Sequence, residues 1–461
     1  MQKHWPLILV IVVSLVVHFA YFGYPKQTVF DEVHFGKFIT GYFTHEYFFD
    51  IHPPLAKLLL SGMGYLSGFQ PGFSFAEIGQ KFTDHTYLWL RLLPTLAGAL
   101  LPLVVFYLVL QLGYSRWAAT TAGLLTALDN ALLVQSRFIL LDSFLLIFGF
   151  SALLFYFKYR SAPLTSTRIR YLLLTGISGA LAVSVKWTGA TFLALPIILE
   201  LVRIIRYTST SKTAWVRLVV CLGVVPLLLY FAIFTIHFQL LTKSGPGDAF
   251  MTPPFQKTLA GNHHQADPQI KPAGLVQKFI GLNFEMFRAN ANLTAGHPYA
   301  SQWYTWPFML RPIYYWNESL PGNQIDTTPA RIYLLGNPAI WWGATVGIFY
   351  ALLVLVISWF YRQEKPTDPK TLYLLAGAYL LNLLPFIGIT RAMFLYHYFA
   401  AFIFALLLTV ILIDQTTNRR KIFIGWVLAS VVLFIFFAPL SYGRPIRETT
   451  YQWRAWFNSW R

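Results

Sequence analysis

The stretch IFIGWVLASVVLFIFFAPLS, residues 422–441, carries no charged side chain over its whole length. A helix needs about 20 predominantly apolar residues to cross the hydrocarbon core of a bilayer. Comparable runs recur along the chain and predict about eleven membrane-spanning helices. They begin near Trp5, Tyr87, Ala118, Phe138, Tyr171, Thr188, Val216, Ala339, Leu372, Phe394 and Ile422. We therefore expect an all-α integral membrane protein with a single multi-pass domain over residues 1–461.

The composition of the chain excludes an ordinary water-soluble protein. Of its 461 residues, 56% are hydrophobic and 11% are charged, whereas soluble domains carry about a quarter charged residues. The net charge of +17 does not indicate a nucleic-acid-binding protein, because the basic residues fall in loops between the apolar runs and no nucleic-acid-binding motif accompanies them. The single cysteine excludes a disulfide within the chain. His263 and His264 have no supporting carboxylates, so we expect no metal and no cofactor.

Lysine and arginine concentrate in every second connection between these runs. These connections hold Lys158, Arg160, Arg168, Arg170, Arg203, Arg206, Lys212, Arg217, Arg362, Lys365, Lys370, Arg419, Arg420 and Lys421. Because basic residues mark cytoplasmic loops, the N-terminus is predicted to lie in the cytoplasm. Residues 1–23 are expected to remain as a signal-anchor, since no small-residue cleavage site follows the apolar run.

Two long connections fall on the opposite, outer side in this topology. They cover residues 25–86 and about 239–336, and the aromatic, basic tail at 441–461 lies on the same side. Such a tail is typical of a segment in the membrane interface. Long structured loops gathered on one face often carry function. We therefore expect residues 25–86 to form a catalytic loop.

The first outer loop places two acids side by side, Asp31 and Glu32, just after the first apolar run. A carboxylate at membrane level can act as a general base if burial raises its pKa or if an acceptor hydroxyl is held against it. The structural alternative is that the pair caps a helix or binds arginines. Ionisable groups at membrane depth favour the functional interpretation.

Two short interfacial helices are expected around this acid pair. Apolar and aromatic residues run from Val33 to Phe43, and a second stripe at helical spacing begins at Leu55. Pro53 and Pro54 suit the first turn of the second helix, and Asp50 is a candidate for its N-cap.

Isolated cations occur near the outer ends of several spans. They are Arg91, Arg137, Lys186 and Arg391, each alone in an apolar context. Cations that converge at one membrane depth would bind the phosphate of a lipid head-group. The alternative is that each cation pairs with a local acid or extends toward lipid head-groups. Asp142 follows Arg137 by about one helical turn, so we interpret it as the structural partner of that arginine.

The segment HPYASQWYTWPFMLRPIYYW, residues 297–316, concentrates aromatic side chains in the large outer loop. Aromatic platforms suit sugars and peptides, so His297 and Trp303 could form a wall of an acceptor site. Interfacial anchoring explains the same composition equally well.

Six stretches of this sequence resemble the protein O-mannosyltransferases, membrane glycosyltransferases of the GT-C type. The stretches are FDEVHFGKF (30–38), FFDIHPPLAKLLL (48–60), SRFILLDSFLL (136–146), VKWTGA (185–190), HPYASQWYTWPFM (297–309) and YHYFAAFIFALLL (396–408). They occur in the family's order and cover nearly the whole chain. Eukaryotic members carry a further β-trefoil domain in the large outer loop, and residues 239–336 are too few to contain it. The chain therefore resembles the compact prokaryotic form.

This resemblance implies transfer of mannose from a polyprenyl (dolichyl-like) phosphate mannose to Ser or Thr hydroxyls of exported proteins. It implies an inverting, metal-independent reaction with Asp31 as the general base and Glu32 in support. By the same resemblance, Arg91 would pair with these acids or position the donor. Lys186, Arg137 and Arg391 would bind the donor phosphate, and Arg91 is counted with them as a candidate. His52, Asp50, His297, Trp303 and His397 would contact the acceptor or support the site. The expected location is a prokaryotic cell membrane, with the active site on the extracytoplasmic face and the secretion machinery as a further partner.

Two other functions remain open at this point. An enzyme of the same fold could use the same class of donor with a lipid or glycan as acceptor. A transporter would instead place ionisable residues near the middle of the bilayer, and here they gather at the outer ends of spans.

Overall fold

The structure, a computed structural model, describes residues 4–207, 212–292, 296–318, 329–360 and 368–461. Within these residues, nine helical segments are long and apolar enough to cross a membrane. They are formed by α4 (Thr86–Gln111), α7 (Asp142–Ser161), α8 (Thr165–Val185), η1 (Trp187–Gly189) with α9 (Ala190–Tyr207), α10 (Lys212–Val219) with η2 (Val220–Val224) and α11 (Val225–Leu240), α14 (Pro338–Phe360), α15 (Pro369–Leu383) with η5 (Leu384–Gly388), η6 (Leu395–Tyr398) with α16 (Phe399–Asp414), and α17 (Arg419–Tyr442).

Two more apolar segments complete the predicted set. Helices α5 (Arg116–Ala127) and α6 (Asn130–Ser136) are together long and apolar enough for one span, with a bend of 58° between them, and α1 (Trp5–Phe19) is a shorter apolar helix. Each of the eleven predicted runs therefore corresponds to one helical segment of the described chain. The prediction of an all-α multi-pass membrane fold is confirmed.

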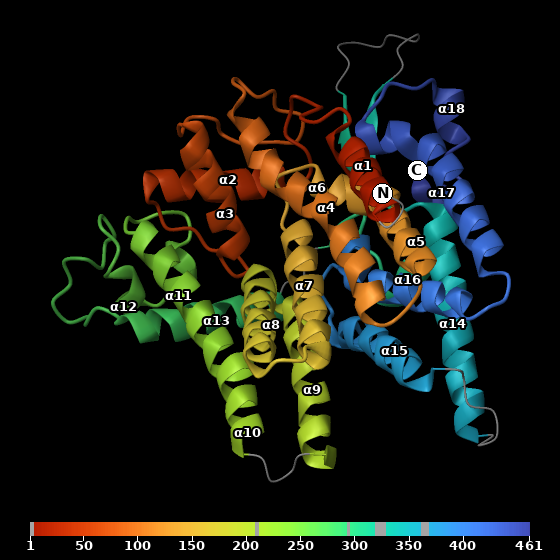
Figure 1. Cartoon of the computed structure of the whole chain (residues 1–461). Coiled ribbons are helices and arrows are strands. Elements are labelled where there is room, and N and C mark those ends of the chain that lie inside the picture. The colour runs from red at the N-terminus through yellow and green to blue at the C-terminus, as the bar shows by residue number, and fades with distance from the viewer. Residues whose placement is uncertain (1–3, 208–211, 293–295, 319–328, 361–367) are drawn as a thin grey trace.

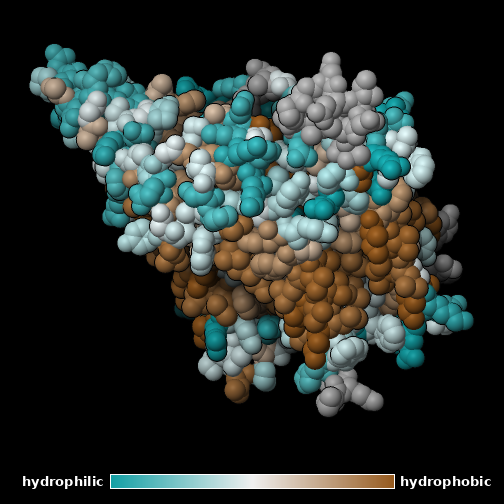
Figure 2. All heavy atoms as spheres, turned by 90° about the horizontal axis from the view of Figure 1, so that it is seen from above, coloured by the Kyte–Doolittle hydropathy of each residue, from teal (hydrophilic) through white to brown (hydrophobic). Residues whose placement is uncertain are grey.

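Helix α16 lies at the centre of the bundle, where it packs against α14, α15 and α5. It is apolar around its whole circumference, and 72% of its spanning window is buried, as expected for a helix surrounded by protein. Helix α17 is only 22% buried over the same length, so most of its surface faces lipid. Figure 2 shows a broad hydrophobic surface bordered by hydrophilic side chains, the pattern of a protein that sits in a bilayer.

The first outer loop contains the two expected short helices, α2 (Glu32–Thr44) and α3 (Leu55–Ser67). They lie beside each other at one side of the molecule, near α11 (Figure 1). The prediction that Asp50 caps α3 is wrong, because Pro54 is the N-cap and no side chain caps this helix. Instead, the Asp50 carboxylate accepts a hydrogen bond from the Lys57 ammonium.

The large outer loop contains elements that the sequence did not predict. They are η3 (Asp248–Phe250), α12 (Pro253–Gln256), α13 (Leu275–Asn292), η4 (Trp303–Phe308), β1 (Ile313–Asn317) and β2 (Arg331–Leu334). The two strands form an antiparallel hairpin in which Ile313 lies opposite Leu334. Helix α13 leaves Ile280 and Phe284 exposed, which is typical of a helix that lies in the membrane interface.

The C-terminal tail packs onto this large outer loop. It forms α18 (Glu448–Gln452) and η7 (Asn458–Trp460). The buried Trp460 indole N–H donates to the Met309 carbonyl at 2.9 Å, and Arg311 donates to the Ser459 carbonyl at 3.0 Å. Trp453 remains exposed. The tail therefore joins the outer layer that covers the spans.

Candidate active site

The two adjacent acids of the first outer loop have different surroundings. Helix α2 begins at Glu32 with Asp31 at its N-cap, so the two side chains leave the helix start in different directions. Glu32 is fully buried and receives the Arg91 Nε–H at 2.8 Å and an Nη2–H at 2.7 Å. The backbone N–H groups of Val29 and Ile139 also donate to it, at 2.8 and 2.9 Å. Glu32 thus joins the first outer loop to the spans.

Arg91 is fully buried, and its hydrogen bonds are inconsistent with the predicted binding of a donor phosphate. A guanidinium carries five N–H donors. Two of those of Arg91 bind Glu32, and the others bind the carbonyls of Gly23, Pro25 and Gln27 at 2.7–2.9 Å. No N–H group is left for a phosphate, so we assign Arg91 to positioning Glu32 and the loop before it.

Arg137 is also directed away from a donor site. It is 2% exposed, and its Nη groups donate to the carbonyls of Ala20 at 2.6 Å and Tyr21 at 2.7 Å, at the end of α1. Its guanidinium lies 4.7 Å from the ring centre of Tyr442. The interpretation of Asp142 as its partner is wrong, because the Asp142 carboxylate binds Lys186 and Gln135 instead.

The remaining two cations open onto a single cavity of about 400 Å³. Lys186, between α8 and η1, lines it from one side, and Arg391, in the loop before η6, lines it from another. Lys186 donates to both Asp142 carboxylate oxygens, at 2.7 and 2.9 Å, and its ammonium lies 5.0 Å from the Tyr396 ring centre. In the described part of the chain, Arg391 has no acidic partner. The cavity therefore presents one paired and one unpaired positive charge.

Two predicted histidines line the same cavity. They are His52, which precedes α3, and His397 in η6. Burial lowers the pKa of His52 well below its usual value, and the positive charges of Lys186, Lys57 and Arg391 lower it further. His52 is therefore a neutral imidazole at neutral pH, able to donate or accept one hydrogen bond.

Three other predicted residues lie outside this cavity. Asp50 is held by Lys57, His297 is exposed and packs edge-on against Phe394, and the partly buried Trp303 sits in η4. None of them lines the cavity. Any contact that they make to a substrate would come from a part of it that extends beyond this space.

Asp31 is the carboxylate without a fixed partner in this region. No side chain or N–H group of the described residues donates to it, and it remains partly accessible to solvent. Burial raises the pKa of its carboxyl to about 7, while the positive charge of Lys186 opposes this rise. The negative charges of Asp142 and Asp50 act in the same direction as burial. A carboxylate with a pKa near neutrality can take up and release a proton at working pH.

A chain of hydrogen bonds links the outer loop to Lys186. No sequence pattern predicted it. The Tyr315 hydroxyl, on β1, donates to the side-chain oxygen (Oε1) of Gln135. The side-chain N–H (Nε2) of Gln135 in turn donates to the Asp142 carboxylate at 2.6 Å. The Tyr315 ring stacks on Phe30 with ring centres 4.1 Å apart, and the Phe30 N–H donates to the Tyr315 carbonyl at 3.1 Å. Tyr315 thus contacts both the residue before Asp31 and the network that holds Lys186.

Among the described residues, no group of three or more His, Cys, Asp or Glu side chains is arranged to hold a metal ion. The region instead combines the unpartnered Asp31 carboxylate with the paired ammonium of Lys186 and the guanidinium of Arg391. The two cations line the cavity, whereas Asp31 does not line it and lies within electrostatic reach of Lys186. Such a set can take a proton from a hydroxyl and stabilise a developing anion.

The sequence profile of the dolichyl-phosphate-mannose–protein mannosyltransferases matches residues 8–242. The chain belongs to this family. A second profile, the C-terminal four-transmembrane region of protein O-mannosyltransferases, matches residues 275–460. The family predicted from the motifs is confirmed, and with it a membrane glycosyltransferase.

Individual relatives agree with this assignment. The chain is 25% identical to dolichyl-phosphate-mannose–protein mannosyltransferase 1 of Saccharomyces cerevisiae, over 95% of the chain and 81% of the relative. It is 37% identical to the protein of the same name from Candida albicans, over 57% of the chain but only 31% of that longer relative. The solved structure of the S. cerevisiae Pmt1–Pmt2 complex bound to the sugar donor superposes with a TM-score of 0.89 at 22% identity, over all of this chain and 93% of that one. This similarity confirms the GT-C fold.

Proposed function

We propose that the protein transfers a mannosyl group from a polyprenyl phosphate mannose to the hydroxyl of a Ser or Thr residue in a protein acceptor. Support comes from the family, whose name specifies a dolichyl-phosphate-mannose donor and a protein acceptor. The yeast complex with the same fold is described as bound to the sugar donor. The observation that carries the proposal is the unpartnered carboxylate of Asp31 within electrostatic reach of Lys186, which lines a cavity with Arg391.

Asp31 supplies the proton acceptor of the reaction. The hydroxyl of Ser or Thr is a weak nucleophile at neutral pH and gains reactivity from a positioned base. As the hydroxyl oxygen bonds to the anomeric carbon, its proton passes to the Asp31 carboxylate. The pKa of about 7 suits this role, because a substantial share of the Asp31 carboxyl is ionised near neutral pH and the carboxylate is still basic enough to accept the proton.

Lys186 and Arg391 stabilise the leaving group. The bond between the anomeric carbon and the phosphate oxygen breaks as the new bond forms, and its electron pair stays on the phosphate. Fixed positive charge in a site shielded from water stabilises this developing anion and makes an acid catalyst unnecessary. Displacement in one step by the acceptor oxygen inverts the anomeric centre. The products are the mannosylated protein, polyprenyl phosphate and a protonated Asp31.

The distribution of basic residues supports an extracytoplasmic site. Lysines and arginines follow the opposite ends of the spans, and positive loops face the cytoplasm. The carbohydrate would then be transferred to acceptor chains that have already crossed the membrane.

The direct test replaces Asp31 by Asn in the full chain, assayed in membranes with radiolabelled polyprenyl phosphate mannose and a Ser/Thr peptide. We expect transfer to fall by about 10²- to 10⁴-fold, the usual contribution of a general base. The matched control is Asp84→Asn, because Asp84 is an exposed acid of the same outer loop and its carboxylate accepts hydrogen bonds from the neighbouring Thr86. Transfer by Asp31→Asn at the rate of the control would remove Asp31 from the mechanism. Transfer to a lipid or glycan with none to the peptide would assign a different acceptor.

A further inference from the structure

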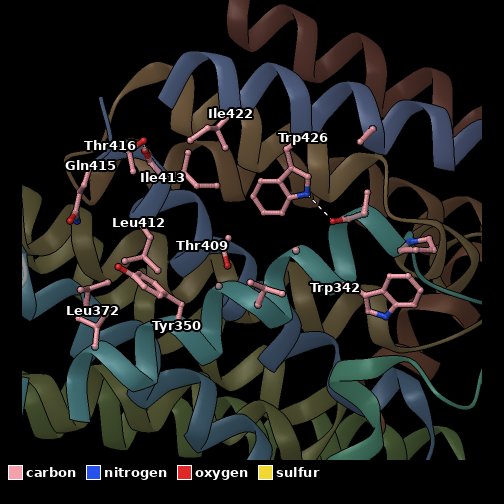
Figure 3. Close-up of a pocket in the computed structure, with 17 residues that line it drawn as sticks. Trp342, Tyr350, Leu372, Thr409, Leu412, Ile413, Gln415, Thr416, Ile422 and Trp426 are labelled. Atoms are coloured by element: carbon pink, nitrogen blue, oxygen red, sulfur yellow. Dashed lines mark hydrogen bonds between the residues drawn. The ribbon is translucent and has the colours of Figure 1, made fainter. Parts of the chain in front are cut away.

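A second, larger cavity lies at the membrane-facing side of the bundle, away from the catalytic cavity. It is a groove of about 960 Å³ between α14 and α17, with α16 as its floor. Figure 3 shows Trp342 at one end of it and Gln415 and Thr416 at the other. None of its lining residues lines the catalytic cavity. Most of these residues are apolar, so an occupant must be largely hydrocarbon.

Two glycines of α14 let this helix pack closely against α16 and α17, and this packing fixes the position of the groove walls. A side chain at Gly347 would collide with Thr409, and one at Gly343 would meet the Trp426 ring at about 3 Å. The Trp426 indole N–H donates to the Ala339 carbonyl at 2.8 Å and ties α17 to the start of α14. Val346, 69% exposed, stands along one wall of the groove. The walls are therefore fixed, while the space between them opens laterally toward lipid.

The two ends of the groove differ in charge. At one end Trp342 is covered by the aromatic rings of Trp456 and Trp460 from the tail. The other end leads to the turn between α16 and α17 and to the first residues of α17, which are Arg419, Arg420 and Lys421.

Two acids lie near this end of the groove among the described residues. Asp368 precedes α15 and accepts the Tyr114 hydroxyl at 2.8 Å. Asp414 is the last residue of α16. It accepts hydrogen bonds from the Ser115 N–H and hydroxyl and pairs with Arg419 at 3.5 Å. Arg420 and Lys421 are both exposed and have no acidic partner in the described chain. The mouth of the groove thus carries a surplus of positive charge.

We propose that the groove binds one acyl chain of an anionic glycerophospholipid, whose phosphate lies against Arg420 and Lys421. An apolar slot that opens toward lipid matches the chain, and a basic turn at one mouth matches a negative head-group. The Gln415 amide can donate hydrogen bonds to phosphate or ester oxygens, whereas the Thr416 hydroxyl donates to the Ile413 carbonyl at 2.8 Å. A second copy of this protein would bring the same basic turn against its own positive charge, so lipid is the better match.

The test measures lipid retention by the full chain with native mass spectrometry, after exchange into micelles that contain phosphatidylglycerol or phosphatidylcholine. Ala429→Trp fills the groove, and Leu428→Trp is its matched control, because Leu428 is the adjacent residue on α17 but faces away from the groove. The double variant Arg420→Gln/Lys421→Gln removes the charges. Its control, Arg206→Gln/Lys212→Gln, makes the same change at exposed positions that flank another connection.

We expect the wild-type chain and both controls to retain one phosphatidylglycerol in preference to phosphatidylcholine. Ala429→Trp should lose this lipid. The Arg420/Lys421 double variant should lose the preference by roughly 10- to 30-fold, since each basic residue near a membrane surface contributes about 1 kcal/mol to anionic-lipid binding. Equal retention by Ala429→Trp and Leu428→Trp would overturn the proposal. So would a dimer that Ala429→Trp alone converts to monomer, because the occupant would then be a second copy.

Discussion

Two charged clusters lie close together beneath the first outer loop, and they differ in how completely their hydrogen bonds are satisfied. In the Glu32–Arg91 cluster, every guanidinium N–H has an acceptor and the carboxylate has four donors. In the second cluster, Asp31 has no donor and Arg391, which lines the cavity with Lys186, has no acid among the described residues. Saturated groups hold the backbone in place, whereas unsaturated groups remain available to a substrate.

This difference explains why neighbouring acids in one motif have separate roles. A buried ion pair is stable only when further hydrogen bonds satisfy both partners, and Glu32 meets that requirement. The loop from Gly23 to Gln27 is thereby fixed, and Asp31 leaves the same rigid helix start toward Lys186. A catalytic carboxylate needs this support, because a rigid neighbour sets its position without binding it.

The largest predicted difference between the two clusters is in the free energy of unfolding, which a substitution in the Glu32–Arg91 cluster should lower. Glu32→Gln leaves the Arg91 charge buried without a counter-charge, and we expect the free energy of unfolding to fall by about 3–5 kcal/mol. Denaturant-induced unfolding in detergent measures this change. The exposed Glu77→Gln in the same loop is the control and should unfold like the wild type. A Glu32→Gln protein of unchanged stability would show that the saturated cluster does not hold the loop.

The second prediction concerns the cavity. Lys186→Met removes one fixed charge from the proposed phosphate site, and we expect kcat/KM for the donor to fall by about 10²- to 10³-fold. Because Asp142 then loses its cation but can keep its bond to Gln135, folding should be less affected than in Glu32→Gln. Steady-state kinetics with varied donor concentration measure the loss. The exposed Lys81→Met serves as a control, and equal kinetics in the two variants would exclude Lys186 from donor binding.

The third prediction is the pH dependence of transfer. The reactive form of Asp31 is the carboxylate, and its pKa is about 7, so kcat/KM should rise about tenfold per pH unit up to that value and then level off. The positive charge of Lys186 opposes the rise of this pKa, so Lys186→Met should move the acidic limb to higher pH. Rates measured between about pH 5 and pH 9 test both statements. An acidic limb that persists in the residual activity of Asp31→Asn would assign it to another group.

The sequence predicted the spans because hydropathy depends on local composition. Runs of about 20 apolar residues can do little else than cross a bilayer. The motifs likewise marked Asp31, Glu32, Lys186 and Arg391 as residues of interest. The sequence offered the pairing of Arg91 with the acids as one expectation. It could not predict that the other N–H groups of Arg91, and those of Arg137, bind backbone carbonyls, because carbonyls have no sequence signature.

Two features of the outer layer could not be predicted from the sequence for a related reason. The β1–β2 hairpin lies within an aromatic segment whose composition also suits interfacial anchoring. Gln135 and Tyr315 are neutral side chains separated by 180 residues, and only the folded chain brings them into one hydrogen-bond network. A polar network between distant segments is therefore the feature that sequence patterns reveal least.

The smallest expected effect is that of the hydrogen-bond network from Tyr315 through Gln135 to Asp142. The experiment tests whether this network affects donor binding. Tyr315→Phe keeps the ring that stacks on Phe30 and removes only the hydroxyl that donates to Gln135. The loss of one such hydrogen bond is worth about 1 kcal/mol, so we expect the KM for the donor to rise about fivefold with little change in kcat. Donor-dependent kinetics measure this split.

Tyr333→Phe provides the matched control for that experiment. Tyr333 lies on the other strand of the same hairpin, and its buried hydroxyl pairs with Tyr451 rather than with the network. Loss of that hydroxyl should therefore change stability and leave the KM unchanged. If both variants changed the KM equally, the hairpin would act through its packing alone. A KM change confined to Tyr315→Phe would instead mean that the outer loop sets the position of Lys186 through Gln135 and Asp142.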